Sequence, residues 1–217
     1  MNSDLAKIWQ RLDQEFSSFA FGRAKFPLLF QTGIYDSTVH SAGVSYLLAL
    51  GIEIGLSAIA EYPVIVHADE QWKKTSKVMP DSVWFHPQTR QPWIAFEFER
   101  FEKGDELKIQ DKVQNLALSY YQSCEKIELC VLIYWLRSGI APRAIDPLRK
   151  IFEQGFSTKG LIVTAPKCAL SLYKFVFCQA SSSCGNENKQ IKDERGLYLV
   201  NGEGASKLSI CNATKVQ

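Results

Sequence analysis

Three carboxylates in one short stretch of the chain could bind a divalent metal ion. Asp81 lies in "PDSVWF", and Glu97 and Glu99 are two residues apart in the apolar run "WIAFEFERF". Residues i and i+2 of a β-strand point to the same face, so both glutamates would share one face. Like charges held together disfavour their own ionisation unless a cation neutralises them. Oxygen ligands of this kind favour Mg²⁺ or Mn²⁺, and such ions can promote phosphodiester cleavage.

Residues on both sides of this stretch could complete the site. Glu53 is the only charge in the apolar segment 41–60, and its carboxylate could approach the same cluster from a helix. Lys108 and Lys112 lie at i and i+4 of a later helix, where either could contact the scissile phosphate. Each pattern has a second explanation. Glu97 and Glu99 could lie on the solvent face of an edge strand. Glu53 could lie on the exposed stripe of its helix, and the two lysines could lie on a solvated helix face.

A basic stretch could supply the contacts with a nucleic acid. It is "QWKKTSK", residues 71–77, with three lysines beside one aromatic residue: Trp72, Lys73, Lys74 and Lys77. Basic residues next to an aromatic ring suit phosphate contact and base stacking. A solvated loop explains the stretch equally well, and Arg90, in a turn between two strands, is a weaker candidate.

The elements that must position these residues alternate between helix and strand. Apolar spacing predicts helices and strands over the following ranges: helices at 4–19, 41–60, 105–123 and 143–155, and strands at 61–68, 81–87, 92–101, 127–137 and 159–166. Residues 170–180 fit a strand or a helix, and a further strand begins near 197. The order from 41 to 136 predicts an α/β fold with a mixed central β-sheet flanked by helices and an αβββαβ core.

Composition limits the alternatives. The chain has 217 residues and is 46% hydrophobic, which is enough for a buried core. We divide it into an N-terminal helix with an irregular connection (1–40), an α/β domain (41–180) and a polar C-terminal extension (181–217). The net charge of +2 gives no overall nucleic-acid signature, so any basic surface must be local.

Several other classes of protein are disfavoured. None of the six cysteines forms a CxxC pair, so neither a structural zinc site nor a disulfide framework is expected, and a cytoplasmic location follows. No GxSxG motif is present, and the three histidines show no pairing with a nucleophile. Segment 41–60 has the length of a membrane span, but its serines, glycines and central carboxylate favour a buried helix and no membrane partner.

The span from about 41 to 136 resembles the PD-(D/E)XK nuclease superfamily, which has the restriction-endonuclease-like fold. Pro80-Asp81 followed by Glu97-Phe98-Glu99 is similar to its Pro-Asp and Asp/Glu-x-Lys motif. The resemblance implies that Asp81 and Glu97 bind Mg²⁺ or Mn²⁺ and that an acidic residue on the first helix, here Glu53, assists. It also implies DNA as the substrate and allows a homodimer, because many such nucleases need two sites to cut two strands.

The chain departs from the motif at Glu99, which stands where the family usually has lysine. This ExE form is similar to that of some restriction enzymes, while others carry the lysine on the next helix, where Lys112 or Lys108 would fit. Arg100 should point to the opposite face. The sequence therefore predicts a metal-dependent DNA endonuclease. The alternative is a catalytically degenerate module on the same fold that binds nucleic acid or serves in assembly.

Overall fold

The computed structural model of the chain describes residues 3–27, 29–30, 34–64, 70–73, 77–137, 146–179, 197–200 and 208–210. The helices are α1 (Ser3–Ser18), α2 (Ala20–Lys25), the 3₁₀ helix η2 (Asp36–Thr38), α3 (Val39–Glu53), α4 (Glu70–Lys73), α5 (Glu106–Gln122) and α6 (Asp146–Gln154). The strands are β1 (Ser57–Ala60), β2 (Ser82–Phe85), β3 (Pro92–Arg100), β4 (Leu129–Arg137), β5 (Phe156–Thr158), β6 (Leu161–Val163), β7 (Ala169–Gln179), β8 (Leu197–Val200) and β9 (Leu208–Ile210).

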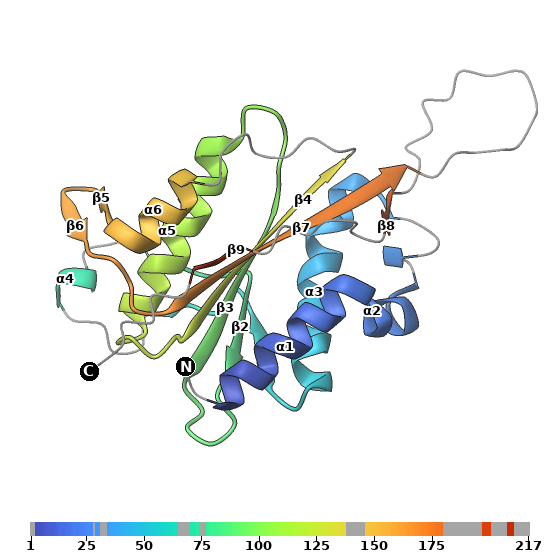
Figure 1. Cartoon of the computed structure of the whole chain (residues 1–217), viewed down its shortest axis with the longest axis horizontal. Coiled ribbons are helices and arrows are strands. Elements are labelled where there is room, and N and C mark those ends of the chain that lie inside the picture. The colour runs from blue at the N-terminus through green and yellow to red at the C-terminus, as the bar shows by residue number, and fades with distance from the viewer. Residues whose placement is uncertain are drawn as a thin grey trace, which may run out of the picture.

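A mixed β-sheet forms the centre of the molecule (Figure 1). Five strands follow one another in the order β1-β2-β3-β4-β7, and β8 and β9 both pair with the outer edge of β7. β1, β2 and β3 are antiparallel neighbours, whereas β3, β4 and β7 run parallel. The parallel pairs require crossover connections, and α5 and α6 supply them.

Helices cover both faces of the sheet, with α1, α2 and α3 on one side and α5 and α6 on the other (Figure 1). Alternation along β3 separates the two cores. Ile94, Phe96 and Phe98 pack in the core beneath α1 and α3, while Ala95 packs in the core beneath α5. Glu97 has the same parity as Ala95, so its side chain points to the α5 face.

The structure confirms the predicted α/β class and the mixed sheet flanked by helices. The strand predicted at 92–101 is β3, the continuous apolar run at 127–137 is β4, and the ambiguous segment 170–180 is strand β7. β4 and β7 are buried among helices and neighbouring strands, as their near-continuous apolar sequences require.

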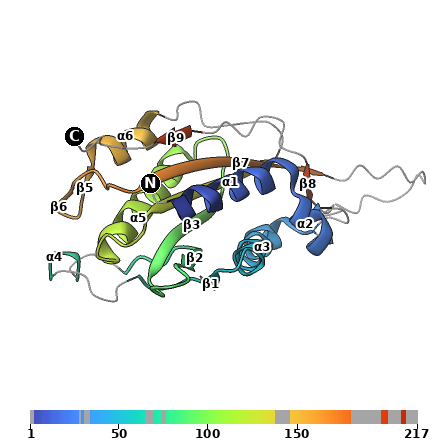
Figure 2. The same ribbon diagram turned by 60° about the horizontal axis from the view of Figure 1, so that its bottom comes forward.

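The predicted helix 41–60 is wrong after residue 53. α3 ends at Glu53, Gly55 adopts a φ of 88°, and β1 begins at Ser57 (Figure 2, where α3 lies beside β1 and β2). A left-handed glycine ends a helix without steric cost, and the run "SAIA" then pairs with β2. The sequence predicts a strand at 61–68, but residues 61–64 form no strand. Residues 65–68 lie outside the described residues. The first of the three strands therefore comes earlier in the chain than predicted.

Two further expectations concern a membrane span and the C-terminal extension. No helix within the described ranges has the length and apolar character needed to cross a membrane. Of the polar C-terminal extension predicted at 181–217, the structure describes only residues 197–200 and 208–210.

Candidate functional site

Asp81 and Glu97 lie side by side where β2 begins alongside β3. Ser82 pairs with Phe96, so Asp81, one residue earlier on an antiparallel strand, lies next to Glu97. The backbone N–H of Phe98 donates to Asp81 Oδ2 at 2.7 Å and fixes the carboxylate of Asp81. Both acidic residues are buried, and Glu97 is only 1% exposed. Antiparallel pairing of β2 with β3 thus brings together two carboxylates that are 16 residues apart.

Helix α5 brings two lysines to the same face. Its apolar stripe, which includes Ile109 and Val113, packs against the sheet and sets the rotation of the helix. Lys112 Nζ then lies 2.8 Å from Glu97 Oε2 and 3.4 Å from Glu99 Oε2. Lys108, one turn earlier, places its Nζ 2.7 Å from Glu99 Oε1. Three predicted acidic residues and two predicted lysines therefore form one connected cluster.

His40 is a site residue that the sequence did not predict. It lies in the first turn of α3, and its Nε2 is 3.4 Å from Asp81 Oδ2. Its ring also meets the ring of Phe98 edge-on, with centroids 6.3 Å apart. Gly43 allows this close packing, because a β-carbon there would overlap the Phe98 ring. Only knowledge of which end of the helix faces Asp81 could have identified His40.

Glu53 does not reach the cluster, which corrects its predicted role. It is exposed and lies at the last turn of α3, the opposite end from His40. A short connection follows α3, and Ser57 then pairs with Phe85 at the end of β2 remote from Asp81. The tight link from α3 to β1 therefore holds Glu53 at the wrong end of the sheet.

Burial and a neighbouring charge act strongly on Glu97. Burial, reinforced by the carboxylate of Asp81, raises the pKa of Glu97 from 4.5 to about 8, although Lys112 opposes the rise. Near neutral pH the Asp81–Glu97 pair therefore holds one proton. A divalent cation would replace that proton, since it also relieves the repulsion between the two carboxylates.

Neighbouring groups also shift the pKa values of Asp81, His40 and Lys112. Burial would raise the pKa of Asp81, but the hydrogen bond from His40, the charge of Lys112 and the Phe98 N–H together hold it below its usual value. The same hydrogen bond to Asp81 raises the pKa of His40, against the effect of burial. Burial lowers the pKa of Lys112, but Glu97 and Asp81 outweigh it and raise the pKa above its usual value.

The structure places the predicted nucleic-acid contacts less favourably. Trp72 is 7% exposed and stacks on Tyr121, with ring centroids 4.7 Å apart, so its ring is not available to a base. This corrects its predicted role, because packing against α5 has taken the aromatic face. Lys77 is exposed, whereas Lys74 and the side chain of Lys73 lie outside what the structure describes.

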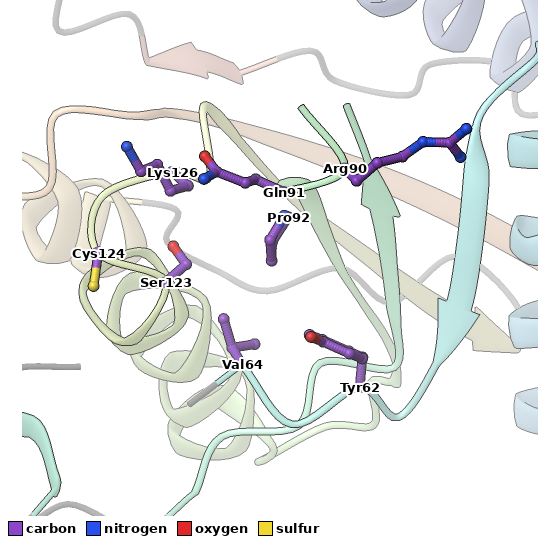
Figure 3. A pocket seen from close by; sticks show the side chains of 8 residues that line it. All are labelled: Tyr62, Val64, Arg90, Gln91, Pro92, Ser123, Cys124 and Lys126. Atoms are coloured by element: carbon purple, nitrogen blue, oxygen red, sulfur yellow. The ribbon is translucent and has the colours of Figure 1, made fainter. Parts of the chain in front are cut away.

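A separate cavity of about 350 Å³ lies near the other end of β3, where Pro92 begins the strand (Figure 3). Its lining includes Tyr62 and Lys126, while Arg90 extends away from the other lining side chains. Pro92 and Glu97 are five residues apart on one strand, so this cavity is not part of the carboxylate cluster. Arg90 is thereby also distant from the predicted site.

The cluster provides part of a metal-ligand set. Within the described ranges, no three His, Cys, Asp or Glu side chains converge closely enough to hold a metal ion. The buried pair Asp81 and Glu97 fits Mg²⁺ or Mn²⁺ in donor type, because Mg²⁺ is commonly bound through one or two carboxylates and completes its shell with water and substrate phosphate. Lys112 is positioned to contact an anionic group bound next to that pair.

Comparisons with known proteins leave the family of the chain open. No family model, no curated protein and no solved structure matches the sequence or the fold.

Proposed function

We propose that the chain is a metal-dependent nuclease that hydrolyses phosphodiester bonds and most readily acts as a DNA endonuclease. One observation carries the proposal. The adjacent carboxylates of Asp81 and Glu97 lie where β2 begins beside β3, with the Lys112 ammonium 2.8 Å from Glu97. Two carboxylates and one lysine are the groups that phosphodiester hydrolysis needs to bind a cation and neutralise a phosphate.

The residues divide the work of hydrolysis. Water adds to phosphorus, one P–O ester bond breaks, and the leaving oxygen takes up a proton, so a phosphomonoester and a hydroxyl result. Asp81 and Glu97 would hold a divalent ion, which would supply Lewis acidity at the phosphate. Lys112 stabilises the negative charge that grows on the phosphate oxygens. His40 holds Asp81 in its ionised form from the other side.

The arrangement of the elements supports a relationship to the PD-(D/E)XK nucleases. Apart from the short helix α4 between β1 and β2, the order α3-β1-β2-β3-α5-β4 agrees with their αβββαβ core. Pro80-Asp81 directly precedes β2, and Glu97-Phe98-Glu99 lies on the adjacent strand β3. The cluster lies toward the carboxyl end of β3, next to parallel β4, which is where open α/β sheets bind their ligands.

The approach to the cluster suits a polyanion. Lys108, whose side chain is 46% exposed, could contact backbone phosphates, which carry most nonspecific affinity for nucleic acids. Exposed Lys77 lies farther away, because its neighbour Val78 bonds to Gln122 at the last turn of α5. The preference for DNA follows from the resemblance to restriction enzymes. A homodimer would place two such sites on two strands.

Cleavage by purified protein tests the proposal. Supercoiled plasmid and single- and double-stranded DNA and RNA oligonucleotides are incubated with Mg²⁺, Mn²⁺ or EDTA. We expect metal-dependent cutting that falls at least about a hundredfold in Asp81→Asn and in Glu97→Gln. Asp111→Asn, at an exposed position of α5, is the matched control and should cut normally. Circular dichroism confirms that each variant is folded.

A degenerate binding module is the second candidate function. The incomplete ligand set and the glutamate at position 99 favour it. Tight, metal-independent oligonucleotide binding without any cutting would support this module and refute the nuclease. Equal cutting by wild type and Asp81→Asn would also refute the nuclease, because the activity would then come from a contaminant.

A further inference from the structure

Glu99 uses both of its carboxylate oxygens to hold lysines of α5. Oε1 lies 2.7 Å from Lys108 Nζ, and Oε2 lies 3.4 Å from Lys112 Nζ. The backbone N–H of Arg100 also donates to Oε1 at 2.9 Å, and the side chain is 12% exposed. The orientation of Glu99 is therefore fixed by two lysines of α5 and by the backbone of β3.

Lys112 lies between two possible carboxylate partners. Its Nζ is 2.8 Å from Glu97 Oε2, the nearer partner, and 3.4 Å from Glu99 Oε2. An ammonium and a divalent cation repel each other, so both cannot remain on the same oxygen of Glu97. If Glu97 were its only partner, displacement by the cation would leave the partly buried Lys112 ammonium unpaired, which costs free energy. Glu99 gives Lys112 a second partner within one short side-chain movement.

We propose that Glu99 is a positioning residue that takes over the Lys112 ammonium when a divalent cation occupies Glu97. It keeps Lys112 beside the reacting phosphate and prevents it from competing with the cation for Glu97. This inference rests on the proposed function. It accounts for an acidic residue where the related motif has lysine: here α5 supplies the lysine, and β3 supplies the charge that holds it.

Ion-induced thermal stabilisation tests the inference without relying on activity. The half-saturating Mn²⁺ or Mg²⁺ concentration is measured at constant pH for wild type, Glu99→Gln, and Glu99→Gln combined with Lys112→Ala. Glu99→Gln leaves Lys112 with Glu97 alone, so we expect the half-saturating concentration to rise about tenfold, the scale typical of groups outside the ligand set. Removing Lys112 as well should restore it to within about twofold of wild type.

Two results of the titration would overturn the role of Glu99. Weak ion binding that persists in the double variant would make Glu99 a ligand of the cation. An unchanged value in Glu99→Gln would show that Lys112 does not compete. Asp111→Asn, at an exposed position of α5, serves as the control for loss of a carboxylate.

The cleavage assay separates this inference from the proposed function. We expect the double variant to bind the ion yet cut poorly, because the lysine is absent. Cutting at the wild-type rate by the double variant would overturn the assignment of Lys112. Wild-type protein that neither cuts nor responds to either ion would overturn the proposed function, and this inference with it.

Discussion

Replacement of Glu97 by glutamine should make the protein more stable at alkaline pH, although it removes an ion pair. Glutamine has nearly the same shape as a protonated glutamate and carries no charge at any pH. In the wild-type protein, burial and Asp81 raise the pKa of Glu97 from 4.5 to about 8. Between pH 4.5 and about pH 8, the folded state therefore retains a proton that the unfolded chain has already released.

The sign of the pH dependence follows from proton linkage. A carboxyl group whose pKa is raised in the folded state contributes stability that is fully present below its unfolded pKa of 4.5. That contribution is lost as the pH rises toward about 8. At 1.36 kcal/mol per pKa unit, the interval from pH 5 to pH 8 accounts for about 4 kcal/mol of unfolding free energy. For a chain of this size the difference corresponds to a change in Tm on the order of 10 °C.

Urea unfolding of metal-free wild type and Glu97→Gln, followed by circular dichroism from pH 5 to pH 8.5 in EDTA, measures the effect. The quantity of interest is the difference between the two proteins, because His40 titrates in both. We expect Glu97→Gln to gain on wild type steadily as the pH rises. Asp111→Asn should run parallel to wild type. Two parallel curves for Glu97→Gln and wild type would refute the argument, since Glu97 would then be ionised throughout.

Three further measurements test other parts of the structure. The half-saturating Mg²⁺ concentration in thermal-shift titrations should fall about tenfold per pH unit from pH 6 to 8 and then level off, because the ion must displace the proton of Glu97. Gly43→Ala should lower the free energy of unfolding by about 1–3 kcal/mol in urea titrations, since its β-carbon would overlap Phe98. Glu15→Ala should cost about 3 kcal/mol in the same titrations, because this buried carboxylate accepts two backbone N–H bonds at the start of α2 and the hydroxyl of Tyr46. Loss of less than about 1 kcal/mol in either variant would contradict these packing and hydrogen-bond arguments.

The sequence predicted those parts of the fold that depend on local periodicity. β3 and α5 follow from clear two-residue and helical repeats, and β4 follows from its continuous apolar run. The pairing of the Asp81 strand with the Glu97 strand follows from the short turn between them. The boundary after α3 was missed because "SAIA" is short and carries little pattern. Only Gly55 indicated that the helix ends before it.

The site was predictable to the same degree and for the same reason. Asp81, Glu97 and Lys112 lie on adjacent elements, so short-range arguments brought them together. Glu53 and His40 lie at opposite ends of one helix, and choosing between them requires the direction of α3 relative to the sheet. That direction depends on tertiary packing, including the close approach of Gly43 to the ring of Phe98.

The pairing of β8 and β9 along β7 has a consequence for solubility. β7 is an eleven-residue, largely apolar strand, and its far edge would otherwise present a long row of unpaired N–H and C=O groups. Such edges recruit strands from other molecules and lead to aggregation. β8 covers Val176–Gln179 and β9 covers Leu170–Leu172. The opposite edge, β1, is only four residues long and is a weaker template for the same reaction. The C-terminal strands, which β4 and β7 separate from the carboxylates, thus protect the sheet from self-association.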